Sequence, residues 1–259
     1  MAAMRKIKVW AGEHPDELAA LGCTNSLETQ PIPNVSPGIA NPLAHLLGRR
    51  WVDMNMAFAF PGDLQSLNYE ERRAVDVLQE SSGYYAVVSL HNFPCFGQDI
   101  AYIDPKRGVS SKVLGLLSNL GLRNLILFDN SRGLQRFAAN ALILETRATG
   151  LGGDIAKLRD AFDELANDPD PTEANASDFR WFRHLTSPHI DQLDPMTLTA
   201  GARRRLLDFE PLPDAFAALL GFEGVPVYLT SWRYAPNEYG YWGETATPVA
   251  TPDDSLWPQ

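Results

Sequence analysis

The stretch Tyr85-Ala-Val-Val-Ser-Leu-His-Asn-Phe-Pro-Cys-Phe-Gly97 decides the fold of this chain. Its first part, up to Leu90, is a short β-branched apolar run, which is typical of a buried strand in a parallel sheet. His91 and Asn92 come where that strand should end, and Pro94 then breaks the pattern. Open α/β sheets bind ligands at the carboxyl ends of their strands, so a histidine here can face a metal or a substrate. A plain structural or surface histidine is the alternative interpretation.

Segments on both sides of this stretch predict further strands and helices. Short apolar runs predict strands at residues 6–11, 123–128 and 140–145. Apolar periodicity and capping residues predict helices through Leu18 and Leu21, over 41–47, from Asn68 and from Asp154. A stretch rich in Pro, Asn and Ser is expected to form a long loop over residues 24–40.

The chain is long enough for one large or two unequal domains, because its 259 residues exceed the about 100–200 residues of a usual domain. The polar, acidic and proline-containing segment 167–178 is typical of a domain linker. Short β-type segments follow it. We therefore expect a catalytic α/β domain over residues 1–172 and a β-rich domain over 173–259 that covers the site.

Composition and charge exclude several classes of partner. The net charge of −10 argues against nucleic acid, because phosphates need clustered Lys and Arg. No apolar run approaches the about 20 residues of a membrane span, and the N-terminus lacks the apolar core of a signal peptide. Two cysteines, Cys23 and Cys95, suit a reducing compartment. We expect a cytoplasmic protein with a small-molecule substrate. The sequence does not decide its oligomeric state, and a homodimer is one of the alternatives.

Four residues form a candidate catalytic metal site. His14 and Glu17 lie between the first strand and the first helix, at a spacing that puts both on one face of a helical turn. This spacing is also typical of a solvated helix start. Together with His91, the pair makes a set of two histidines and one carboxylate that suits a catalytic zinc with an open position. Glu145 closes another strand and can act as the base of a hydrolytic zinc site.

Several short motifs carry a family pattern. They are Gly12-Glu-His-Pro-Asp-Glu-Leu18, Asn41-Pro-Leu-Ala44, Tyr69-Glu-Glu-Arg-Arg-Ala74, Ser89-Leu-His-Asn92, Leu142-Ile-Leu-Glu145, Val225-Pro-Val-Tyr-Leu-Thr230 and Tyr239-Gly-Tyr-Trp242. Over nearly the whole chain they resemble the aspartoacylase and succinylglutamate desuccinylase family, relatives of the zinc carboxypeptidases. The first resembles the family's Gly-x-His-Gly-Asn-Glu zinc motif. The resemblance implies a zinc carboxypeptidase-like mixed sheet with flanking helices, plus a small C-terminal β domain.

The resemblance also implies roles for individual residues. It makes His14, Glu17 and His91 the zinc ligands and Glu145 the general base. The arginine that polarises the scissile carbonyl matches Arg50, with Arg49 as the competitor. Residues implied to contact the substrate are Asn55, Met56, Asn92, Arg136, Tyr239 and Tyr241.

There are three departures from the family pattern, of which the first two concern substrate binding. The family's Asp-Leu-Asn-Arg is here Asp53-Met-Asn-Met56, so a methionine replaces an arginine that grips a substrate carboxylate. A thioether cannot replace a bidentate arginine contact. Arg136 matches a second family arginine only with a one-residue slip, and Ser89 stands where the family has aspartate. We therefore expect N-acetylaspartate and N-succinylglutamate to be poor substrates.

These observations predict a zinc-dependent amidohydrolase that deacylates a small N-acyl amino acid or a related amide. A small peptidase is the alternative enzyme. A non-catalytic relative that binds a small molecule is the alternative from another class, and loss of a ligand or of the base would identify it. An α/β protein without a metal would require the four matches to be coincidence. The sequence does not identify the acyl group or the amine.

Overall fold

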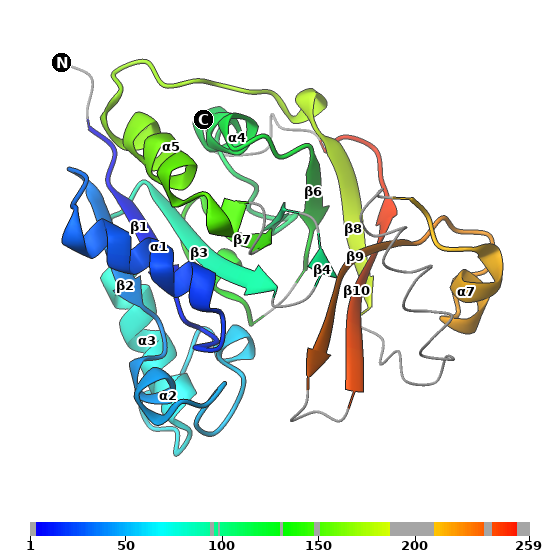
Figure 1. Ribbon diagram of the computed structural model, residues 1–259, viewed down its shortest axis with the longest axis horizontal. Helices are drawn as coiled ribbons and strands as arrows, with labels where there is room; N and C mark the ends of the chain where they lie inside the picture. Colours follow the sequence, from blue (N-terminus) through cyan, green and yellow to red (C-terminus); the bar gives the residue numbers. More distant parts are fainter. Residues whose placement is uncertain are drawn as a thin grey trace.

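The computed structural model describes residues 4–93, 96–97, 99–129, 132–147, 151–186, 210–235 and 240–252. Its strands form a ten-stranded mixed sheet in the order β2-β1-β3-β7-β5-β6-β8-β10-β9-β4 (Figure 1). The strands are β1 (Ile7–Ala11), β2 (Val35–Ile39), β3 (Ala86–Phe93), β4 (Phe96–Gly97), β5 (Ile100–Ile103), β6 (Asn124–Leu127), β7 (Ala141–Arg147), β8 (Arg180–Thr186), β9 (Tyr228–Ala235) and β10 (Gly240–Pro248). The helices are α1 (Leu18–Thr29), α2 (Pro42–Leu47), α3 (Tyr69–Ser81), α4 (Ser111–Asn119), α5 (Ile155–Asn167) and α7 (Asp214–Leu219), with short 3₁₀ turns such as η1 (Met56–Phe58) and η2 (Leu134–Arg136).

The centre of the sheet is parallel. β3 lies between β1 and β7 and runs parallel to both of them. Ala11 of β1 is opposite Leu90 of β3, and His91 of β3 is opposite Glu145 of β7. The carboxyl ends of the three strands therefore meet at one edge of the sheet, as the sequence predicted. β5 runs antiparallel to β7, and β6 and β8 run parallel to β5, so these three strands have the opposite direction to β1, β3 and β7.

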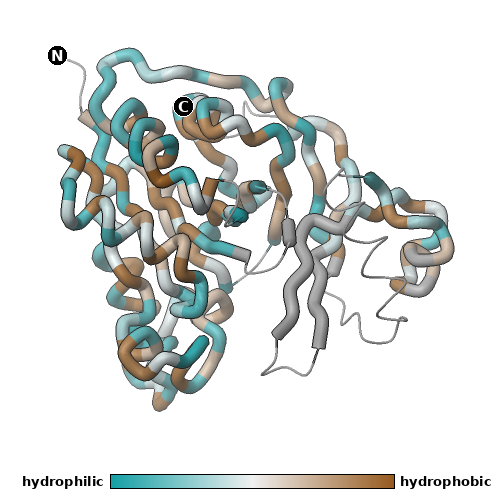
Figure 2. Tube along the Cα trace, viewed as in Figure 1, coloured by the Kyte–Doolittle hydropathy of each residue, from teal (hydrophilic) through white to brown (hydrophobic). Residues whose placement is uncertain are grey.

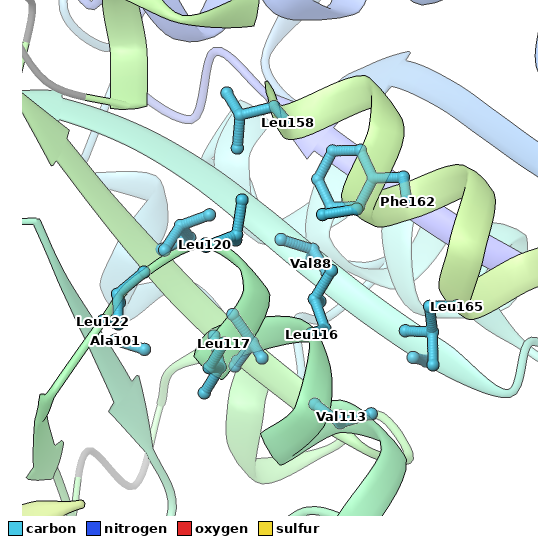
Figure 3. Close-up of a cluster of buried hydrophobic side chains, with 14 of the residues drawn as sticks. Val88, Ala101, Val113, Leu116, Leu117, Leu120, Leu122, Leu158, Phe162 and Leu165 are labelled. Atoms are coloured by element: carbon cyan, nitrogen blue, oxygen red, sulfur yellow. The ribbon is translucent and has the colours of Figure 1, made fainter. Parts of the chain in front are cut away.

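Alternating strand residues build buried apolar clusters on both faces of the sheet. On the first face, residues such as Val88 pack against α1, α4 and α5 in the largest buried apolar cluster. Figure 3 shows part of it, with Leu116 and Leu117 of α4 and Phe162 of α5 around the strands. Phe162 has no exposed surface, and burying such a side chain contributes roughly 1.5–3 kcal/mol. This face is filled by apolar packing.

The second face carries the site. Trp10 of β1 and Val87 of β3 pack against Ala74 and Val77 of α3 in a separate cluster. Successive strand residues point to opposite faces, so Val87, Ser89 and His91 share this second side of β3. Apolar packing near the middle of the strand thus gives way to polar side chains at its carboxyl end.

The expected long loop over residues 24–40 is wrong. α1 continues to Thr29, and residues Val35–Ile39 form β2. β2 contains Pro37 and is one of the two edge strands of the sheet, where a residue without an N–H group is tolerated. Leu27 and Val35 are buried in the large apolar cluster, so tertiary packing overrides the local composition.

The sheet continues beyond the expected linker. The segment between α5 and β8 is mostly hydrophilic (Figure 2), as its sequence indicates. After it, β8 pairs in parallel with β6, and β10 pairs with β8 and β9. The tail strands are thus hydrogen-bonded to the main sheet, and a domain boundary at residue 172 stays a prediction. Among the described residues, no helix has the length and apolar character needed to cross a bilayer.

Candidate metal centre

The three predicted ligands come together at the carboxyl edge of the sheet. His14 and Glu17 lie in the turn between β1 and α1, and His91 lies near the end of β3. Gly12 opens this turn with a φ of 69°, a left-handed conformation that glycine adopts without a steric cost. One ligand atom from each of the three residues lies within 4.8 Å of the others, and all three side chains are buried.

Both histidines face the same carboxylate through the same ring nitrogen. His14 Nδ1 lies 2.8 Å from Glu17 Oε1, and His91 Nδ1 lies 3.1 Å from Glu17 Oε2. A tetrahedral zinc ion with ligands at about 2.0–2.2 Å holds its donor atoms about 3.4 Å apart. The two observed contacts, at 2.8 and 3.1 Å, are hydrogen-bond distances somewhat shorter than this, so the three side chains are near enough to hold one ion after small shifts.

The hydrogen bonds of Asn55 fix the orientation of the His14 ring. Asn55 Oδ1 accepts a hydrogen bond of 3.0 Å from the backbone N–H of Ala57 and lies 2.9 Å from His14 Nε2. Because this oxygen can only accept, Nε2 of His14 carries a hydrogen, and Nδ1 is the ring nitrogen left to face Glu17 or to bind a metal ion. Metal-binding histidines are commonly held in this way through the other ring nitrogen.

The charges of the site also favour a cation. Burial works against a charge on His91, yet Glu17, Glu145 and Glu13 together hold the pKa of its ring well above the ordinary value. Burial likewise works against the charge of Glu17, but His91 and His14 hold the pKa of its carboxyl well below the ordinary range. The buried carboxylates thus create a negative centre that either protons or a metal ion can neutralise. A donor set of two imidazoles and one carboxylate occurs in catalytic zinc sites.

Glu145 lies beside the three ligands but is more accessible than they are. Its residue is directly opposite His91 in the sheet, and its Oε1 lies 4.0 Å from His91 Nδ1. The Glu145 side chain is 13% exposed, against 3% for His91. This position allows the carboxylate to contact a water molecule or a substrate near the ligands.

The structure brings Arg50 to the cluster and leaves Arg49 exposed at the surface. Arg50 Nη1 donates to both carboxylate oxygens of Asp16, each at 2.8 Å. Arg50 Nη2 lies 3.8 Å from Glu17 Oε1 and is buried with no hydrogen-bond partner among the described residues. A buried donor without a partner costs about 1–3 kcal/mol, so a substrate oxygen at Nη2 would recover that energy.

Asn55 and Asn92, expected to contact the substrate, are engaged in holding the site. Asn55 binds His14, as described above. Asn92 donates from its backbone N–H to Glu17 Oε2 at 3.2 Å and from Nδ2 to the backbone oxygen of Thr146 at 2.9 Å. It therefore links the ligand Glu17 to β3 and ties β3 to β7.

Met56 lies in the core. It has no exposed surface and belongs to the apolar cluster of the second face, together with Trp10 and Phe60. Contact between Met56 and a substrate stays a prediction, which this burial does not favour. Tyr239 lies outside the described residues, and Tyr241 is described only as part of the backbone of β10.

Arg136 is not brought to the cluster. Its Nη1 lies 3.2 Å from both Asp104 Oδ2 and Asp129 Oδ1. Asp104 follows β5, whose antiparallel register places Ile103 opposite Leu142. Asp104 is thus about four residues, or roughly 13 Å along the strand, from Glu145. The ion pair with Asp104 therefore holds the Arg136 guanidinium near the amino end of β7, away from Glu145 at its carboxyl end.

Sequence reasoning assigned no role to Glu13 or Asp16. Both belong to the turn that carries His14 and Glu17, at positions within the quoted zinc motif. Glu13 is 2% exposed, and Asp16 pairs with Arg50. The sequence did show an acidic residue next to each candidate ligand of the turn. The partners of these acidic residues lie far away in the sequence, so their roles could not be recognised from the turn alone.

No protein-family model and no curated protein matches this chain. Several solved structures are similar to it. The succinylglutamate desuccinylase from Chromobacterium violaceum covers 97% of this chain and 86% of its own, with 16% identity and a TM-score of 0.67. Murine aminoacylase 3 covers 97% of this chain and 98% of its own, with 17% identity and a TM-score of 0.66.

A succinylglutamate desuccinylase from Vibrio cholerae is similar over a smaller part, with 72% of this chain and 64% of its own covered. Its identity is 17% and its TM-score is 0.55. The likeness to these structures concerns the arrangement of the chain, and it agrees with the resemblance of the short motifs. This chain therefore has the α/β fold of the aspartoacylase and succinylglutamate desuccinylase family.

Proposed function

We propose that this protein is a zinc-dependent amidohydrolase that removes the acyl group from a small N-acyl amino acid. The observation that carries the proposal is the convergence of His14 Nδ1 and His91 Nδ1 on the carboxylate of Glu17, with Glu145 beside them. The fold supports the same reaction class, because the neighbours with this fold are named succinylglutamate desuccinylase and aminoacylase.

His14, Glu17 and His91 would hold the zinc ion, which when bound polarises a carbonyl oxygen and lowers the pKa of a water molecule. Glu145 accepts the proton that the attacking water loses as its oxygen bonds to the amide carbon. The same carboxyl then gives the proton to the nitrogen as the carbon–nitrogen bond breaks. The products are a free amine and a carboxylate.

Arg50 stabilises the oxygen of the amide as it gains negative charge. Its Nη2 has no hydrogen-bond partner among the described residues, whereas Nη1 is fixed by both oxygens of Asp16. The guanidinium is therefore preorganised before the substrate arrives. Removing one donor of this kind typically costs about 2.7–4 kcal/mol of transition-state stabilisation.

The proposed substrate carries less negative charge than N-acetylaspartate or N-succinylglutamate. Two observations support this choice. Met56 stands where the family motif has an arginine, and it is fully buried among apolar side chains. Arg136, the second arginine expected to bind a carboxylate, is paired with Asp104 and Asp129 instead. Neither position therefore offers a free arginine to a substrate carboxylate, and a carboxylate buried without a partner carries a large desolvation cost.

Metal analysis followed by a substrate panel tests the function. The purified protein should contain about one zinc per chain and should release free amine from N-acetyl derivatives of apolar amino acids. The value of kcat/KM should be lower for N-acetylaspartate and N-succinylglutamate, and dipeptides in the panel would reveal a peptidase. Treatment with a chelator should abolish the activity and added zinc should restore it. Absence of zinc, or activity that survives the chelator, would overturn the proposal.

A further inference from the structure

We infer that Glu13 is a positioning residue of the metal centre: through Ser89, its carboxylate holds His91 in the tautomer that leaves Nδ1 free to bind the ion. The inference rests on the proposed function, because it assumes that His91 is a metal ligand. It adds a residue for which the sequence analysis found no role.

Glu13, Ser89 and His91 form a buried chain of polar contacts. Ser89 Oγ donates to Glu13 Oε1 at 2.6 Å, and the same Oγ lies 3.1 Å from His91 Nε2. Glu13 Oε1 itself lies 3.7 Å from His91 Nε2. None of the three residues is more than 2% exposed. Water is therefore largely excluded, and each polar atom depends on its protein partners.

The fold places these side chains together from two strands. Ser89 and His91 are two residues apart on β3, so they point to the same side of the sheet. Glu13 follows the end of β1, which pairs in parallel with β3. The turn that supplies the ligands His14 and Glu17 thus also supplies a carboxylate to the far nitrogen of the third ligand.

The direction of the hydrogen bonds follows from the chemistry of the groups. An ionised carboxylate only accepts, so the single hydroxyl hydrogen of Ser89 goes to Glu13. The hydroxyl oxygen of Ser89 is then an acceptor for a hydrogen on His91 Nε2. A neutral imidazole with its hydrogen on Nε2 has a lone pair on Nδ1, and this atom lies 3.1 Å from Glu17 Oε2. When the ring is neutral, the chain of contacts therefore keeps its hydrogen on Nε2 and leaves Nδ1, the nitrogen that faces the cluster, able to bind the ion.

Among the described residues, the ion pair of Glu13 is with His91, and the adjacent His14 also contributes to lowering the pKa of the Glu13 carboxyl. A buried carboxylate is costly unless it is paired, so its retention here points to a positive centre nearby. Outer carboxylates of this kind make a ligating histidine a stronger donor, and their removal typically weakens metal affinity roughly 10–100-fold.

The test measures zinc affinity by competition with a chromophoric chelator, so it needs no substrate. We expect Glu13→Gln and Ser89→Ala to bind zinc about 10–100-fold more weakly than the wild type. Glu28→Gln is the matched control, because it removes the same charge from an exposed position of α1 and should leave the affinity unchanged. Thermal unfolding of the metal-free proteins establishes that each variant folds.

A rescue variant separates positioning from a general structural role. Ser89→Asp in the Glu13→Gln background moves the carboxylate to position 89, on the same side of β3 as His91. It should recover most of the lost affinity. Failure of this rescue, wild-type affinity in Glu13→Gln, or an equal loss in Glu28→Gln would each overturn the inference. If Glu13→Gln does not fold, the Ser89→Ala variant decides the question: wild-type zinc affinity in that variant would overturn the inference. Failure of the wild-type protein to bind zinc would overturn the proposed function as well.

Discussion

The two histidines of the centre are held by different chemistry on their outer sides. His14 Nε2 is bound by Asn55, a neutral amide whose orientation is set by a backbone N–H. His91 Nε2 faces Ser89 and, behind it, the buried carboxylate of Glu13. Both arrangements direct Nδ1 toward the carboxylate of Glu17, but only the second brings a negative charge to the outer side of the ring. The comparison teaches that a histidine can be held with Nδ1 toward Glu17 either by a neutral amide or by a hydroxyl backed by a buried carboxylate.

Removing the charge-supported histidine should have the largest effect. His91→Ala leaves two protein ligands, too few to retain zinc tightly, so the protein should lose nearly all its metal and its activity. Elemental analysis of the purified variant measures this. His45→Ala is the control, because His45 is an exposed histidine on α2 and should keep about one zinc per chain. Equal zinc in wild type and His91→Ala would refute the ligand assignment.

Glu145 lies on the His91 side of the centre, and its substitution should separate catalysis from metal binding. Glu145→Gln is nearly isosteric but cannot accept a proton from water, so kcat should fall by roughly 10²–10⁴-fold. The zinc content should stay at the wild-type value. Steady-state kinetics with a substrate found in the panel, together with metal analysis, provide the measurement. Turnover at the wild-type rate would show that Glu145 is structural.

Changing Asn55 sharpens the contrast between the neutral and the charged support. Asn55→Ala removes the acceptor of His14 Nε2 and should weaken zinc binding about 10-fold, the lower end of the range for outer partners. Asn55→Asp keeps the acceptor and adds a charge, so its zinc affinity should be at least that of the wild type. The same chelator competition measures both. A tighter complex in Asn55→Ala than in Asn55→Asp would contradict the role assigned to this side chain.

The smallest effect concerns the pH dependence of stability in the metal-free protein. Glu17, Glu145 and Glu13 raise the pKa of His91 in the folded state, so protonated His91 stabilises the fold. This contribution is fully present below the unfolded pKa of about 6.5 and is lost as the pH rises through the higher folded pKa.

Urea unfolding of chelator-treated protein across that range measures the loss. His91→Asn should flatten the dependence on pH, because the titrating group is gone. His45→Ala should leave it as in the wild type. An identical fall of stability with pH in His91→Asn and wild type would show that another group is responsible.

The sequence by itself determined the core of the site. His14 and Glu17 are close in the chain, and their spacing alone puts them on one face of a turn. His91 and Glu145 each close an apolar run, and the carboxyl ends of parallel strands meet at one edge. These inferences depend on short-range geometry and on one rule of sheet architecture, so they were accessible without coordinates.

The tertiary structure alone decided which side chains surround that core. The choice of Arg50 over Arg49 follows from the Asp16 carboxylate across the turn, and the displacement of Arg136 follows from the antiparallel β5, for which no strand was expected.

The residues that hold the outer nitrogens of the two histidines could not be predicted from local sequence patterns either. The contact of Glu13 with Ser89 joins residues 76 positions apart, and that of His14 with Asn55 joins residues 41 apart. Such contacts depend on strand register and on packing between distant segments. A pattern confined to neighbouring residues contains neither, so the sequence determined the candidate ligands and the fold determined how their side chains are held.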